Sequence, residues 1–297
     1  MKLLITALAF TALSAAWAQA APAPRLVQFP RADDTQVQVD VYDRAEGSAD
    51  RALLLVQGST CMTSDAISWR DQVLRETTVR WVAIVRKDGA AADGGCGADY
   101  EAHAVEEARW FDNLAAVHRL KTQLNLRARG AFDVLAVSAG GLTACALAGA
   151  TDDVGALALL STGGGMTFEA ELDLLTKGDK QLVEERRRVR ADPRLGKTWM
   201  GETNPEIWWW SVLGKRCAPL LDGYAGPTLV IHGVKDESTP IESARTLVEA
   251  LKAGGRPVDF VEMPTGHALG LKSLPADRSG IGRAMAWFRA QDRAPRP

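Results

Sequence analysis

A short apolar run that stops at a serine and turns at once into a helix-compatible run is the feature that most constrains this fold. Residues 132–137 are predicted to form a buried strand, and residues 142–148 are compatible with a helix. Ser138 lies between them. A chain that passes from strand to helix within so few residues holds the turn residue in a strained backbone conformation. Bulky neighbours would clash there, and small residues, Ala136 and Gly140, lie two positions before and after the serine.

Two later strands are predicted to end in polar loops that carry acid and base groups. The run 227–233 is β-branched, is bounded by glycine and leads to Asp236, and the run 258–263 leads to His267. The carboxyl ends of parallel strands meet at one edge of a sheet, where active sites collect. We therefore expect Ser138, Asp236 and His267 to lie near one another at that edge.

This arrangement resembles the α/β-hydrolase superfamily, in which a nucleophile elbow is followed along the chain by an acid and then a histidine. Alanine at position 136 stands where the elbow pattern has its first glycine. The resemblance implies an α/β fold with a mostly parallel central sheet and helices on both faces. It also implies a cofactor-free serine hydrolase in which Ser138 is the nucleophile, His267 the base and Asp236 the acid.

The resemblance also implies an oxyanion hole after the first strongly buried strand, residues 51–56. Gln57 and Gly58 follow this strand where many α/β-hydrolases have a histidine and a glycine, so Gln57 departs from the pattern. The expected donors are the backbone N–H groups of Ser59 and Ala139, because the reaction needs donors aimed at the developing negative charge.

Other residues compete for these roles. His103 and His118 fall in a long helix predicted over residues 101–126, where a solvated or capping role is expected. His232 ends a buried strand, where a hydrogen-bonded core histidine is the usual role. Glu237 is the nearest alternative to Asp236 as the acid.

The regular alternation of strands and helices fails between Gly163 and Gly226. Before that point, strands at 25–30 and 36–42 are predicted as edge strands, and the later strands alternate with helices as parallel sheets require. Within the break, residues 169–190 are charge-rich and predict a helix. The resemblance suggests a helical cap or lid over the serine, inserted at about 163–226 into a single hydrolase domain of residues 21–297. A surface elaboration far from the site is the alternative.

Three consecutive tryptophans, Trp208 to Trp210, lie in this insertion. Neighbouring helical side chains differ in direction by about 100°, so three adjacent indoles cannot all face one pocket. Packing between insertion and body is expected for at least one of them. Trp208 and Trp209 are candidates for lining a substrate pocket.

Residues 1–20 are typical of a signal peptide, with a short positive start, an apolar stretch and a small-residue cleavage site. The segment is too short for a transmembrane anchor, and the protein is expected to be periplasmic or secreted. Disulfides persist in such compartments. Cys61 and Cys96 lie in neighbouring strand-end loops and form the favoured pair, whereas Cys145 is expected to be a buried thiol and the partner of Cys217 stays open.

The composition excludes several classes of function. The 297 residues are 24% charged with a net charge of −2, and no basic stripe indicates nucleic-acid binding. The carboxylates of loop 88–99 lack the spacing of a calcium loop, and no metal or cofactor is expected. A small carboxylic ester is the favoured substrate. A prolyl-peptidase-like amide hydrolase and a non-catalytic binding protein on the same fold are the alternatives.

Overall fold

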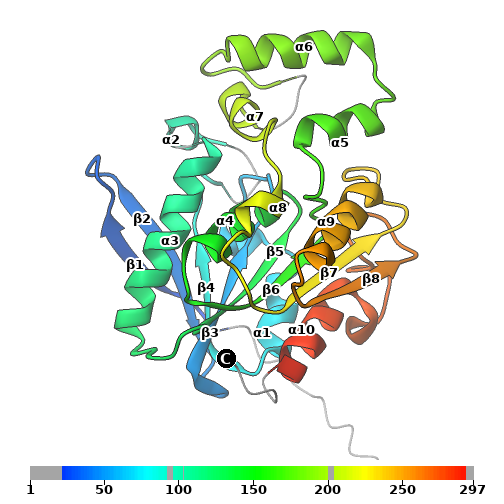
Figure 1. The fold of residues 1–297 in the computed structure, drawn as a ribbon. Coiled ribbons are helices and arrows are strands. Elements are labelled where there is room, and N and C mark those ends of the chain that lie inside the picture. The colour runs from blue at the N-terminus through cyan, green and yellow to red at the C-terminus, as the bar shows by residue number, and fades with distance from the viewer. Residues whose placement is uncertain (1–21, 92–95, 103, 200–203, 292–297) are drawn as a thin grey trace, which may run out of the picture.

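An eight-stranded sheet forms the centre of the computed structural model, which describes residues 22–91, 96–102, 104–199 and 204–291 (Figure 1). The strand order is β1-β2-β4-β3-β5-β6-β7-β8. The first two pairings, β1 with β2 and β2 with β4, are antiparallel, and all the others are parallel. The strands are β1 Arg25–Pro30, β2 Gln36–Asp43, β3 Ser48–Val56, β4 Val79–Val85, β5 Phe132–Val137, β6 Val154–Leu160, β7 Thr228–Gly233 and β8 Val258–Met263.

Helices cover both faces of the sheet. They are α1 Arg70–Glu76, α2 Ala98–Ala102, α3 Glu106–Gln123, α4 Gly140–Ala150, α5 Phe168–Leu175, α6 Lys180–Ala191, α7 Glu206–Val212, α8 Cys217–Leu220, α9 Ile241–Ala253 and α10 Gly280–Gln291.

The central strands are apolar on both faces because both faces are covered. Successive strand residues point to opposite sides of a sheet. Leu54 and Val134 belong to the core beneath α3, α4 and α9, whereas Leu53 and Leu135 belong to the core beneath α1 and α10. Figure 1 shows α3, α4 and α9 in front of the sheet and α1 and α10 behind it.

Two predicted helices are wrong in their extent. The segment 169–190 forms two helices, α5 and α6, because Lys177 and Gly178 between them adopt φ of 53° and 68°, which ends a helix. The helix expected over 101–126 is divided between the end of α2 and α3, because Val105 between them is extended. His103 lies outside the described residues, and His118 is exposed on α3.

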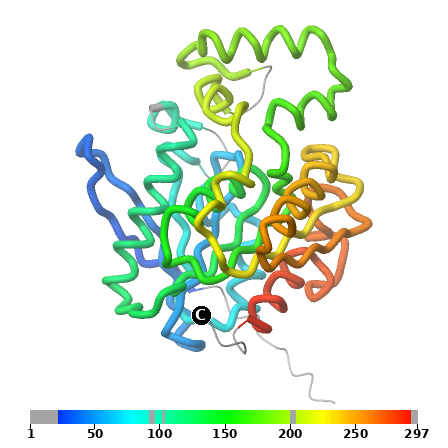
Figure 2. Tube along the Cα trace, in the orientation of Figure 1, coloured from blue at the N-terminus to red at the C-terminus, as the bar shows by residue number. Residues whose placement is uncertain are grey.

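The segment between β6 and β7 forms α5 to α8. Figure 2 shows its trace leaving the sheet after β6, running through α5, α6 and α7 at the top of the view, and returning through α8 to β7. Helices α5, α6 and α7 therefore lie beyond the edge of the sheet, whereas α8 packs against α4 and α9 in one of its covering layers.

Two disulfides are present. Cys61 is bonded to Cys96, the pair that the sequence favours. The expectation of a buried thiol at Cys145 is wrong, because Cys145 on α4 is bonded to Cys217 on α8. These cysteines are 72 positions apart, and only the packing of α8 against α4 brings their Cα atoms within 5.5 Å.

Candidate active site

The turn after β5 lifts Ser138 out of the sheet. Its φ is 56°, in the left-handed region that residues other than glycine rarely adopt and that costs of order 1–3 kcal/mol. The Ser138 N–H donates to the Leu160 carbonyl at 2.8 Å, and the Gly141 N–H donates to the Ser138 carbonyl at 3.0 Å. A β-carbon at position 140 would come within 2.5 Å of the Gln57 carbonyl oxygen, so the small residue there is required by close packing against β3.

The loops after β7 and β8 bring Asp236 and His267 into contact. His267 Nδ1 lies 2.8 Å from Asp236 Oδ2 and 3.0 Å from Oδ1. An Nδ1–H that donates to a carboxylate leaves Nε2 as the proton acceptor. Glu237, the alternative acid, is exposed and does not contact the imidazole through any hydrogen bond.

Asp236 is held in its ionised form. Burial of the carboxyl opposes ionisation, but the hydrogen bond and charge of His267, together with the N–H groups of Ser238 and Thr239, lower its pKa below the ordinary value. His232 lies on the other side, with Nε2 3.4 Å from Asp236 Oδ2. Burial lowers the pKa of His232, and its Nε2 lies 3.0 Å from the Thr239 carbonyl oxygen, as in a neutral core histidine.

Ser138 and His267 line one pocket, although no hydrogen bond joins the hydroxyl to the imidazole. Catalytic hydrogen bonds are often long before a substrate is bound. The pocket has a volume of about 610 Å³ and is walled by the elbow, the loop after β3, and residues of α5 and α7. Of the three consecutive tryptophans, Trp208 and Trp209 line it and Trp210 is 46% exposed.

The loop after β3 approaches the serine closely. A β-carbon built on Gly58 would lie 3.0 Å from the Ser138 β-carbon. Ser59 and Ala139 both line the pocket, and among the described residues neither backbone N–H donates to another backbone group. Both predicted oxyanion donors are therefore free to bind a ligand oxygen.

Two buried basic side chains, Lys87 and Arg109, hold this loop, and neither was predicted from the sequence. Lys87 Nζ donates to the carbonyl oxygens of Gly58 at 2.5 Å and Thr60 at 2.6 Å. Arg109 Nη2 donates to the Gln57 carbonyl at 2.9 Å. Fixing the carbonyls on either side of Ser59 also fixes the direction of its N–H. The position of Lys87, two residues after the end of β4, was the one available signal.

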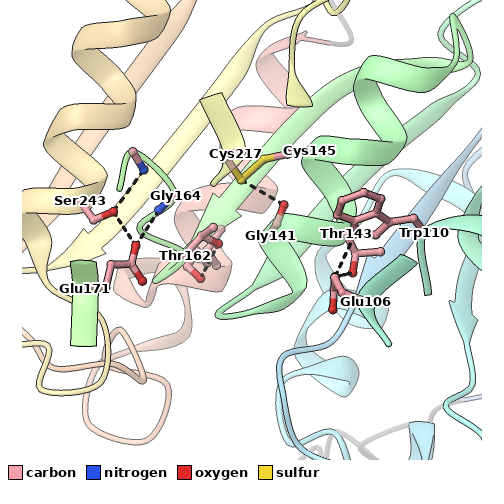
Figure 3. Close-up of a disulfide and its surroundings, with 12 residues drawn as sticks. Glu106, Trp110, Gly141, Thr143, Cys145, Thr162, Gly164, Glu171, Cys217 and Ser243 are labelled. Atoms are coloured by element: carbon pink, nitrogen blue, oxygen red, sulfur yellow. Dashed lines mark hydrogen bonds between the residues drawn. A yellow bond between two sulfur atoms is a disulfide. The ribbon is translucent and has the colours of Figure 1, made fainter. Parts of the chain in front are cut away.

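A buried glutamate, Glu106, accompanies these basic side chains. It accepts hydrogen bonds from Thr143 and Trp110 (Figure 3). It also accepts one from Trp208, and its carboxylate lies 3.5 Å from Arg109. Burial and the nearby Arg109 lower the pKa of Lys87 well below its ordinary value, and the charge of Glu106 opposes this shift.

A second buried glutamate, Glu171 on α5, lines the pocket itself and was also missed. Its Oε1 accepts hydrogen bonds from Ser243 Oγ at 2.5 Å and from the Gly164 N–H at 3.1 Å. Burial raises the pKa of Glu171 to about 7, and the two hydrogen bonds offset only part of this shift.

Within the described ranges, no three His, Cys, Asp or Glu side chains come together as a metal site requires. In the same part of the chain, no helix combines the length and hydropathy needed to cross a bilayer.

No protein-family model matches this sequence, and no curated protein matches it either. Solved structures do match. An esterase from Pyrococcus furiosus is 14% identical with a TM-score of 0.62 over 90% of each chain, and an esterase from Thermogutta terrifontis is 18% identical with a TM-score of 0.58 over 93% of this chain and 97% of the other.

An acylaminoacyl peptidase from Pyrococcus horikoshii is 13% identical with a TM-score of 0.63 over 92% of this chain. The chain spans only 42% of that larger protein. All three matches share a mostly parallel sheet flanked by helices with this chain. Together with the eight-stranded sheet and the strained turn at Ser138, they show that this chain has the α/β-hydrolase fold.

Proposed function

We propose that this chain is a serine hydrolase that cleaves carboxylic esters through an acyl-Ser138 intermediate. One observation carries the proposal. The His267 imidazole, fixed by Asp236 at 2.8 Å, lines the same pocket as a serine held in a left-handed turn. A serine hydroxyl is a poor nucleophile alone, and an oriented imidazole is what activates it.

In this mechanism, His267 Nε2 takes the hydroxyl proton as Ser138 Oγ attacks the carbonyl carbon. Asp236 stabilises the imidazolium through the Nδ1–H bond. The alcohol leaves with the proton from His267, and the acyl group stays on the serine. A water molecule, deprotonated by His267, then attacks the acyl carbon, and the acid departs as the serine recovers its proton.

The backbone N–H groups of Ser59 and Ala139 are proposed to bind the oxyanion that forms in each step. Loss of one such donor costs on the order of 3 kcal/mol of transition-state stabilisation. Lys87 and Arg109 are positioning residues in this proposal, because they hold the carbonyls of the loop that carries Ser59.

We propose that the insertion at about 163–226 acts as a cap over the serine. It contributes an aromatic wall to the pocket, formed by Phe168, Trp208 and Trp209. Such a wall suits an acyl or aryl group of modest size, which supports an ester as the substrate.

An amide is the second candidate substrate, because two similar structures are peptidases: the acylaminoacyl peptidase and a puromycin-hydrolysing peptidase from Mycobacterium tuberculosis, which is 16% identical with a TM-score of 0.60. The same acyl-serine chemistry cleaves both bonds. We also propose that the protein is exported, with residues 1–20 as its signal peptide, and the two disulfides support this compartment.

A fluorophosphonate probe tests the nucleophile. We expect stoichiometric labelling of the native protein and of Ser273→Ala, a control at an exposed serine, but none of Ser138→Ala. Absence of labelling in the native protein would favour a binding protein on this fold. A panel of nitrophenyl esters and aminoacyl arylamides then separates the substrates, and turnover of amides alone would overturn the ester assignment.

A further inference from the structure

Within the described ranges, Glu171 differs from the other buried acids in having no cationic partner. Each of the others is paired with arginine or lysine: Asp40 with Arg86, Asp112 with Arg31, Asp133 with Arg51, Asp153 with Lys121, Glu106 with Arg109, and Glu206 with Arg188 and Arg194. Among the described residues, Glu171 receives only the hydrogen bonds of Ser243 and Gly164. Burying an unpaired carboxylate is costly, so its retention calls for a reason beyond stability.

The carboxylate has one oxygen left for a ligand. Both protein hydrogen bonds go to Oε1, and Figure 3 shows the second oxygen pointing away from Ser243 and Gly164. The loop before α5 is shaped around this group. Gly163 has φ of 68°, and a β-carbon there would lie 2.4 Å from Glu171 Oε1.

The pocket around Glu171 favours positive charge. Among the described residues that line it there is no lysine or arginine, and its other carboxylate belongs to Glu237. The nearby charge of Asp236 makes the surroundings still more negative and contributes to the raised pKa of Glu171. Two indole side chains, Trp208 and Trp209, also line it, and indole rings attract cations.

We propose that Glu171 binds a protonated amino group of the substrate, so that the substrates are esters or amides that carry a cation. The proposal rests on the hydrolase function proposed above and names its substrate class. Glu171 is a specificity-determining residue in this scheme and takes no part in the proton transfers at Ser138.

A binding experiment tests the proposal without turnover. In Ser138→Ala protein at pH 8, titration with hexylammonium and with hexanol, followed by calorimetry, compares a cation with a neutral molecule of similar size. We expect the ammonium to bind roughly 10- to 100-fold more tightly, as a charge-assisted hydrogen bond allows. The preference is expected to vanish when Glu171→Gln is added and to remain when Glu169→Gln is added. Glu169 lies on the same helix, pairs with Arg190 and does not line the pocket.

A kinetic experiment tests cation binding by Glu171 during ester hydrolysis. Nitrophenyl esters of ω-amino acids of three to six carbons are each paired with the alkanoyl ester in which a methyl group replaces the amine. For at least one length, we expect kcat/KM of the wild type to favour the cation roughly 10- to 100-fold. Glu171→Gln is expected to abolish this ratio, and Glu169→Gln is expected to keep it.

The outcomes separate this proposal from the proposed function. Hydrolysis with no preference for the cation at any length, in the wild type as well as in Glu171→Gln, would overturn the role of Glu171 and leave the hydrolase. Preferential ammonium binding that depends on Glu171, in a protein that hydrolyses nothing, would retain the cation site and overturn the hydrolase. The wild-type comparison of paired esters does not depend on how well Glu171→Gln folds.

Discussion

The inserted segment buries two glutamates in opposite electrostatic surroundings. Glu206, at the start of α7, is inaccessible to solvent and accepts hydrogen bonds from Arg188 and Arg194. Burial opposes its ionisation, but the two guanidinium groups outweigh burial and lower the pKa of Glu206 to about 2. At Glu171, burial prevails and raises the pKa to about 7.

The difference separates two tasks within one insertion. In the part that carries α6 and α7, the Glu206 carboxylate links the two helices. Arg188 and Arg194, which belong to the same insertion, compensate its charge. In the part that faces Ser138, the Glu171 carboxylate is instead neutralised by a bound cationic ligand in our proposal. A stability test and a ligand test should therefore respond to different glutamates.

The largest effect is expected from the disulfide that anchors the insertion to α4. The Cys217 N–H also donates to the Gly164 carbonyl, and the Gly164 N–H donates to Glu171. The disulfide therefore lies next to Glu171. Removing a cross-link across a separation of 72 residues in Cys145→Ala/Cys217→Ala should lower the free energy of unfolding by about 4 kcal/mol.

Urea denaturation of the double variant measures this loss. Cys61→Ala/Cys96→Ala is the matched comparison, and its separation of 35 residues predicts a loss smaller by about 0.6 kcal/mol. An unchanged midpoint in the first variant would show that the insertion is anchored by packing alone.

Glu206→Gln should lower the free energy of unfolding at pH 7 by roughly 3 kcal/mol, because it leaves two arginines without their buried partner. The folded pKa of about 2 lies below the ordinary 4.5, so this stabilisation is present above about pH 4.5 and is lost as the pH falls toward 2. Urea titrations at pH 7 and pH 3 measure it. Glu184→Gln, in an exposed pair with Arg187 on α6, is the control and should change nothing measurable. Equal losses at both pH values would contradict the ion-pair account.

Lys87→Met extends the comparison to a buried lysine. It removes the donors to the Gly58 and Thr60 carbonyls, and we expect kcat on a nitrophenyl ester to fall about 100-fold. KM should change by less than about threefold, since the loop acts on the transition state. Steady-state kinetics measures both, with Lys252→Met on the exposed face of α9 as the control. A rise in KM at constant kcat would assign Lys87 to substrate binding instead.

Glu171→Gln should change the stability in the opposite direction. The folded pKa of about 7 lies above the ordinary 4.5, so the wild type loses stability as the pH rises from about 4.5 through 7. At pH 8 the variant should be more stable by at most about 3 kcal/mol, and below about pH 4.5 the two proteins should be alike. Thermal unfolding across this range measures the difference. A variant less stable than the wild type at pH 8 would mean that the carboxylate is satisfied within the protein.

Local pattern was enough to predict the strands and the position of Ser138. An apolar run such as 132–137 is stable as a strand inside a sheet that is covered on both faces, and the turn after it needs small neighbours. The helix boundaries were less predictable. The break at Lys177 and Gly178 lies in a charge-rich stretch whose composition suits a helix throughout.

The sequence by itself determined the fold class, the strand-end positions of Ser138, Asp236 and His267, and the favoured pairing of Cys61 with Cys96. Only the tertiary structure decided that Cys145 is bonded to Cys217 and that Lys87 and Arg109 donate hydrogen bonds to the loop after β3. It also decided that Glu171 lines the pocket with no cationic partner among the described residues. The physical reason is the separation along the chain over which each kind of interaction acts. Periodicity and turn chemistry act between neighbours in the chain, whereas the surroundings of a buried charge are set by segments such as α5 and α9 that meet only when the chain has folded.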